Sequence, residues 1–178
     1  GFSIKTEIQE FDTFEQFAKD VAIGAEDLVL CGEHTFDKYI APLNTGVQTL
    51  FREKYGKGEP TDGMVDAILD ELRDKKYNRI IAVGGGTVID IAKVVAVASE
   101  KDCIDDLYDN VGNLKKYHPL IIVPTTCGTG SEVTDISVIN RVSKGVKMGL
   151  ANPAMLADTA VMITNMLDSL PYKIFATS

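Results

Sequence analysis

The segment RIIAVGGGTVIDIAK, from Arg79 to Lys93, carries the clearest structural pattern of this chain. It begins with a continuous apolar run, Arg79 to Val83, which has the length and composition of a buried strand. Three glycines end the run, and the following segment, Thr87 to Ser99, is apolar almost all round, which predicts a buried helix. A fully apolar strand that turns tightly into such a helix is typical of a parallel sheet covered on both faces.

The rest of the chain repeats this alternation of short apolar strands and helical segments. We predict strands over 27–31, 120–123 and 160–163, helices over 12–21, 36–51 and the segment after Asp62, and a hairpin of 137–142 with 146–151. The pattern predicts an α/β fold, a Rossmann-like doubly wound parallel sheet. In that architecture ligands bind beyond the carboxyl ends of the strands.

Length and composition narrow the possible functions. The 178 residues, 45% apolar and 25% charged, suit one globular domain with its own core. A formal charge of −8 argues against nucleic acid and anionic membranes as partners, and no apolar run approaches the roughly 20 residues of a membrane span. Three scattered cysteines favour a reducing, cytoplasmic location, and the two histidines lack the spacing of metal ligands.

The glycine loop, Gly84, Gly85 and Gly86 followed by Thr87, has two interpretations. Glycines between a strand and a helix let the backbone approach a ligand closely, and the helix start favours a phosphate. The same glycines would also suit a tight structural turn without a ligand. No lysine follows them at the spacing of a P-loop, which argues against an ATPase.

A second polar loop, PTTCGTGSEVT from Pro124 to Thr134, follows the strand predicted over 120–123. The hydroxyls of Thr125, Thr126 and Thr129 can donate and accept hydrogen bonds, as ribose hydroxyls or a carboxamide would require. The alternative is a self-satisfied turn that caps the next element. Two such loops on strands of one parallel sheet favour a shared nucleotide site.

These two segments resemble the signatures of a known family. GGGTVIDIAK is similar to GGGSxxDxAK, and PTTCGTGSEVT to PTTxGTGSExT, of the iron-dependent (group III) alcohol dehydrogenases, with 4-hydroxybutyrate dehydrogenases as the nearest subtype. The resemblance extends over nearly the whole chain. It implies an oxidoreductase that transfers hydride between NAD(H) and a small alcohol or hydroxy acid, such as 4-hydroxybutyrate with succinate semialdehyde.

The resemblance also implies roles for individual residues. The pyrophosphate would lie on Gly84, Gly85, Gly86 and Thr87, the nicotinamide and ribose near Thr125, Thr126 and Thr129, and a ribose near Lys147. Asp90 and Lys93 are interpreted as organising the loop and helix.

The chain departs from the family pattern on the adenosine side. Gly32 stands where the family often has an aspartate that disfavours NADP, and the adjacent Glu33 could take over that role. Glu59 replaces a usual asparagine and adds negative charge. We therefore expect NAD as the cofactor, with NADP as the alternative.

The family's metal is held by an aspartate and three histidines of a helical second domain, and His34 and His118 do not match those ligands. We therefore expect residues 1–178 to form the dinucleotide-binding domain, without catalytic or metal-binding residues and without the C-terminal helical metal-binding domain. The predicted properties of this chain are cofactor binding without turnover, and self-association into a homo-oligomer through uncovered apolar surface. The alternatives are a non-catalytic nucleotide-binding or assembly fragment and a glycerol dehydrogenase-like branch of the fold.

Overall fold

The computed structural model describes residues 5–126 and 130–167, and its centre is a parallel β-sheet. Within these residues the sheet has six strands in the order β1-β8-β5-β4-β2-β3, and every neighbouring pair is parallel. The predicted doubly wound fold is therefore confirmed. The strands are β1 (Glu7–Phe11), β2 (Asp27–Cys31), β3 (Gln48–Phe51), β4 (Arg79–Gly84), β5 (Leu120–Pro124) and β8 (Thr159–Ile163).

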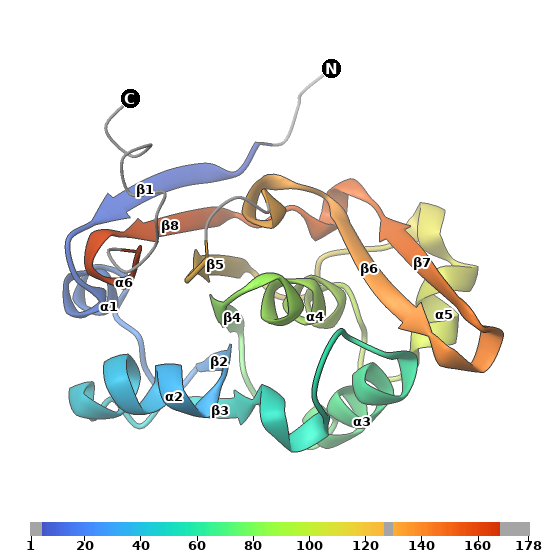
Figure 1. Cartoon of the computed structure of the whole chain (residues 1–178), viewed down its shortest axis with the longest axis horizontal. Helices are drawn as coiled ribbons and strands as arrows, with labels where there is room; N and C mark the ends of the chain where they lie inside the picture. The colour runs from blue at the N-terminus through green and yellow to red at the C-terminus, as the bar shows by residue number, and fades with distance from the viewer. Residues whose placement is uncertain (1–4, 127–129, 168–178) are drawn as a thin grey trace.

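Helices cover both faces of this sheet. Figure 1 shows α1, α2 and α6 on one side and α3, α4 and α5 on the other. Thr13 and Thr61 cap the first turns of α1 and α3 by accepting the backbone N–H groups of Gln16 and Met64. The helices are α1 (Phe14–Val21), α2 (Glu33–Thr35), α3 (Asp62–Leu72), α4 (Gly86–Ala96), α5 (Ile104–Asp109) and α6 (Thr164–Leu167).

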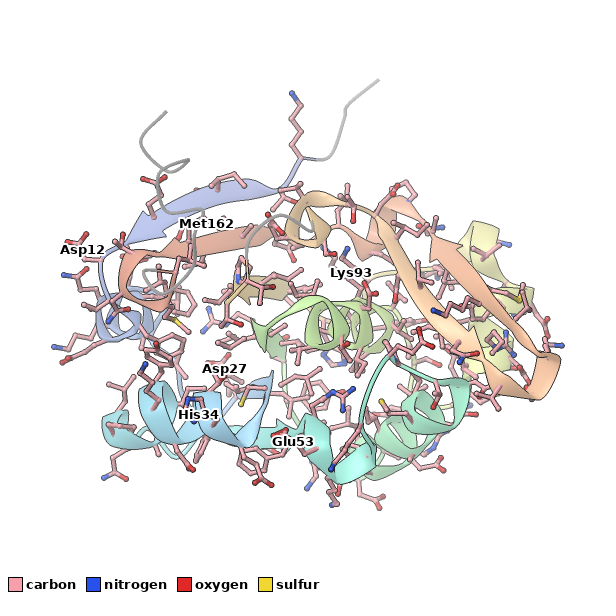
Figure 2. All side chains as sticks on the ribbon, in the orientation of Figure 1. Asp12, Asp27, His34, Glu53, Lys93 and Met162 are labelled. Atoms are coloured by element: carbon pink, nitrogen blue, oxygen red, sulfur yellow. The ribbon has the colours of Figure 1, made fainter. Side chains whose placement is uncertain are left out.

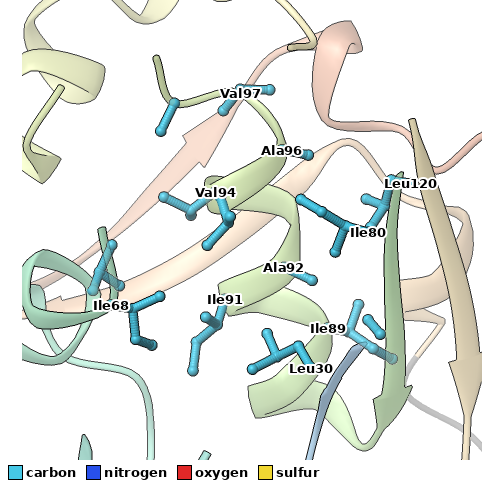
Figure 3. Close-up of a cluster of buried hydrophobic side chains, with 14 of the residues drawn as sticks. Leu30, Ile68, Ile80, Ile89, Ile91, Ala92, Val94, Ala96, Val97 and Leu120 are labelled. Atoms are coloured by element: carbon cyan, nitrogen blue, oxygen red, sulfur yellow. The ribbon is translucent and has the colours of Figure 1, made fainter. Parts of the chain in front are cut away.

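The central strands are buried on both faces, which explains why their sequences are continuously apolar. In β4, Ile80 and Ala82 belong to the core cluster under α3 and α4, whereas Ile81 and Val83 belong to the cluster under α1. Figure 3 shows the first cluster, in which Ile89 and Ile91 of α4 face the sheet and α3. The predicted burial of this helix is confirmed, because α4 packs against the sheet, α3 and a hairpin.

That hairpin consists of β6 (Ile136–Arg141) and β7 (Val146–Ala151), as the sequence predicts. Gly145 takes a φ of 68° in the turn between them, a conformation that a glycine adopts without strain. The inward residues of β6, Ser137, Ile139 and Arg141, are buried. The hairpin thereby forms a lid over α4 beside the main sheet (Figure 1).

The prediction of one helix over 36–51 is wrong in its second half. Residues Phe36–Ile40 and Ala41–Leu43 are helical, but Asn44 adopts a φ of 50° and Gly46 a φ of 70°, which end the helix. The next four residues pair with β2 as strand β3. Leu50 is buried in either interpretation, so its helical spacing from Val47 was misleading.

Strand β1 and the short helices α2, α5 and α6 were not predicted. Strand β1 lies at the sheet edge with most of its residues exposed, so it lacks the apolar run of a central strand. Helix α5 is short and polar outside Ile104 and Leu107. Among the described helices, none combines the length and the apolar character needed to cross a bilayer.

Candidate functional site

The glycine loop joins the end of β4 to the start of α4. A Cβ at Gly84 would lie 2.9 Å from Val88 Cβ, so only glycine allows the helix to start this close to the strand. Gly85 is the N-cap of α4 and provides no side-chain cap. Among the described residues, a Cβ at Gly86 would meet no atom within 4 Å outside the adjoining backbone of α4. The loop therefore presents the open backbone of a helix N-terminus, where an anion is favoured.

The threonine loop lies directly beside the glycine loop. Strands β4 and β5 are neighbours, with Gly84 opposite Pro124, and the Thr125 N–H donates to the Gly84 carbonyl at 3.0 Å. A Cβ at Gly85 would lie 3.4 Å from Thr126 Oγ1. Thr125 is half-buried, whereas the Thr126 side chain is exposed at the carboxyl edge of the sheet. The expectation that the two loops share one edge is confirmed.

The remaining signature residues of these loops lie around this junction. Thr87 is the second residue of α4 and is half-buried. Thr129 lies outside the described residues, so its predicted role remains a prediction.

Lys93 connects helix α4, which follows the glycine loop, to the segment that follows the threonine loop. Its side chain is fully buried on α4 (Figure 2), and its Nζ donates to Thr134 Oγ1 and to the Ile136 carbonyl, both at 3.0 Å. Burial lowers the pKa of Lys93 despite the nearby carboxylates of Asp90, Asp135 and Glu132. The lysine therefore anchors the segment that follows the threonine loop to the helix that follows the glycine loop.

Asp90 adds a second connection between α4 and β6. Its carboxylate accepts the Val138 N–H, and its carbonyl accepts the Ser137 hydroxyl at 2.9 Å. Burial raises the pKa of Asp90, although Lys93 and the Val138 N–H favour the charged form. These contacts agree with the interpretation of Asp90 and Lys93 as organising residues.

Lys147 lies on β7 and forms an ion pair with Glu59. The Lys147 Nζ is 2.6 Å from Glu59 Oε2, and Asn140 Nδ2 donates to Glu59 Oε1 at 3.3 Å. Both members of the ion pair are substantially exposed. The charge of Glu59 is thus compensated, which weakens its expected part in excluding NADP.

Glu33 begins α2 at the end of β2, with an exposed side chain. Its backbone N–H donates to Glu53 Oε2 at 2.8 Å. Sequence reasoning missed Glu53, because the predicted helix over 36–51 hid the fact that this residue follows a strand. The strand end after Phe51 was the signal that could have found it.

The chemistry of the described residues suits a dinucleotide. The junction offers helix-start amides and hydroxyls, and the Cβ position of Gly86 has no contact among the described residues outside the adjoining backbone of α4, as an approach by phosphate and ribose oxygens requires. Across residues 5–126 and 130–167, no group of three or more His, Cys, Asp or Glu side chains could hold a metal.

Comparison with known proteins identifies the family. A model of iron-containing alcohol dehydrogenases matches residues 6–164. The chain belongs to this family. It is 44% identical over 172 residues to a 4-hydroxybutyrate dehydrogenase from Clostridium kluyveri, an alignment that covers 97% of this chain and 46% of that relative. The chain therefore spans about half the length of that relative.

Solved structures show the same fold. A sulfoacetaldehyde reductase from Bifidobacterium kashiwanohense, solved in complex with NAD+, has a TM-score of 0.77 at 23% identity, covering 99% of this chain and 49% of that one. An iron-containing alcohol dehydrogenase from Thermotoga maritima has a TM-score of 0.75 at 25% identity, covering 96% and 49%. The Rossmann-like fold of the family member is thus shared with enzymes that are about twice as long.

Proposed function

We propose that this chain is the dinucleotide-binding domain of an NAD(H)-dependent iron-containing dehydrogenase that interconverts 4-hydroxybutyrate and succinate semialdehyde. The substrate is proposed from the similarity to the Clostridium kluyveri enzyme. The observation that carries the cofactor proposal is the contact between the glycine loop and the threonine loop at the carboxyl ends of β4 and β5. Dinucleotides bind at this edge in doubly wound folds.

The proposed roles of the residues follow from their positions. The amides of Gly85, Gly86 and Thr87 would bind the pyrophosphate, because they lie at the start of α4 and no side chain caps this helix. The hydroxyls of Thr125 and Thr126 would orient the nicotinamide side, with Thr129 as a further candidate. A bound nicotinamide supplies the hydride acceptor and donor.

The role of Lys147 in ribose binding depends on its ion pair. Because the pair with Glu59 is exposed, exchanging a carboxylate for a ribose hydroxyl would cost little free energy. We also propose that the metal is bound by a separate domain and that this chain does not turn over substrate without that domain. We further propose that the chain forms a homo-oligomer.

A calorimetric titration with NADH tests the cofactor site. Gly86→Ala should weaken NADH binding by about tenfold, because the added methyl group would occupy space that the protein leaves open for the ligand. Gly63→Ala is the matched control: Gly63 lies in the first turn of α3 and also has no atom near its Cβ position. Failure of the wild-type chain to bind NADH would refute the proposal.

A further inference from the structure

A carboxylate reaches the end of β2 from a neighbouring strand. Glu53 lies in the short 3₁₀ turn Arg52–Tyr55 directly after β3, and Figure 2 labels it near the α2 segment that carries His34. Its Oε2 accepts the Glu33 N–H at 2.8 Å. Among the described residues, no group donates a hydrogen bond to Glu53 Oε1, so this oxygen can accept a hydrogen bond from a ligand.

The carboxylate occupies the space of a missing side chain. A Cβ at Gly32 would lie 3.3 Å and 3.4 Å from the two Glu53 carboxylate oxygens. An alanine at position 32 would bring its Cβ into tight contact with this carboxylate, which would have to move by a few tenths of an ångström. Gly32 therefore leaves room for the carboxylate of Glu53, which follows β3, to lie against the backbone that follows β2.

This place lies beside the glycine loop. Strand β2 is the neighbour of β4, and Cys31 pairs in register with Val83. Gly32, which follows β2, and Gly84, the last residue of β4, consequently lie at the same edge of the sheet, about 5 Å apart in the pairing direction. In dinucleotide-binding folds an acidic residue near the glycine loop accepts hydrogen bonds from the adenosine ribose.

Charged groups of both signs lie around Glu53. Burial, with smaller contributions from the Glu53 and Asp37 carboxylates, raises the pKa of the Cys31 thiol to about 12, which places both carboxylates close to the end of β2. The adjacent Arg52 keeps its positive charge, and its guanidinium is oriented by a hydrogen bond to the Gly56 carbonyl. Lys38 lies over the ring of Tyr39.

We propose that the Glu53 carboxylate binds the adenosine ribose and repels a 2′-phosphate, so that Glu53 rather than Glu33 determines the preference for NADH over NADPH. This inference rests on the proposed dinucleotide site. Glu33 contributes its backbone N–H, which holds Glu53 in position, while its own side chain is exposed.

Titration of four proteins with NADH and with NADPH tests the inference. Glu53→Gln removes the charge but keeps an oxygen that can accept the Glu33 N–H, and it should raise the ratio of NADPH to NADH affinity by about tenfold. Glu33→Gln is the matched control, which removes one charge at the adjacent position and should leave the ratio unchanged. Gly32→Ala crowds the carboxylate without changing any charge and should raise the ratio in the same direction, but by less than Glu53→Gln does.

The outcomes separate the two proposals. If the wild-type chain binds neither dinucleotide, the proposed function is wrong. If it binds NADH, but Glu33→Gln changes the ratio while Glu53→Gln and Gly32→Ala do not, the assignment to Glu53 is overturned. Thermal melting of each variant establishes that the compared proteins are folded.

Discussion

The backbone N–H of Thr125 donates to the carbonyl oxygen of Gly84 at 3.0 Å, just beyond the last paired residues of β4 and β5. This hydrogen bond extends the parallel ladder by one step into the two loops. The hydrogen bond thereby holds the start of α4 and the threonine loop side by side at the carboxyl edge of the sheet. Any displacement of the Gly84 backbone should affect both loops.

Gly84→Ala should destabilise the fold by about 1–3 kcal/mol, because its methyl group would overlap Val88 at the start of α4. Urea denaturation measures the change in the free energy of unfolding. Gly86→Ala, two residues away in open space, should be neutral or slightly stabilising, since alanine is the better helix former. Equal destabilisation by both variants would contradict the packing argument.

Lys93→Met should destabilise the fold by about 2–3 kcal/mol, since Thr134 and the Ile136 carbonyl lose a charged donor. Hydrogen exchange should accelerate most in residues 134–138, the segment that Lys93 anchors. The exposed Lys115 provides the control variant Lys115→Met. Uniform acceleration over the whole chain would show that Lys93 supports the core in general and not this segment.

Asp27→Asn should destabilise the protein by about 1–3 kcal/mol without changing NADH affinity. The nearly buried Asp27 carboxylate binds Arg79 through two hydrogen bonds of 2.9 Å and 3.0 Å and accepts the Gly24 N–H. These residues border a cavity of about 320 Å³ at the amino ends of the strands, opposite the candidate site. Urea denaturation measures the stability loss, and NADH titration measures the affinity. A lower NADH affinity of a fully folded Asp27→Asn variant would show that this ion pair also supports the candidate site.

Asp62→Asn should reduce the dependence of stability on acid pH. Burial alone would raise the pKa of Asp62, but hydrogen bonds from Ser143 and Gly63 and the charge of Arg141 lower it overall. The charged form therefore stabilises the fold at any pH above the ordinary value of about 4. This contribution is lost as the pH falls from there through the lower pKa of the folded state.

Urea denaturation at a series of pH values tests this dependence. The difference in free energy of unfolding between the wild type and Asp62→Asn should be constant near neutral pH and shrink below about pH 4. A difference that stays the same at every pH would mean that the ionised carboxylate contributes no stability.

Strands β2, β4 and β5, the glycine loop and the threonine loop could be predicted from the amino-acid sequence, because consecutive residues encode each of them. Continuous apolar runs specify strands buried on both faces, and glycine specifies close backbone approach. The adjacency of the two loops was also predictable, since carboxyl ends of parallel strands gather at one edge.

Tertiary structure alone decided the features that join distant segments. Residues 48–51 carry both helical and strand spacing, and pairing with β2 selected the strand. The contact of Glu53 with Gly32 and the ion pair of Lys147 with Glu59 link residues on different elements, whose side chains meet only after the sheet and hairpin have formed. No local pattern encodes such contacts, because they depend on the three-dimensional order of the strands.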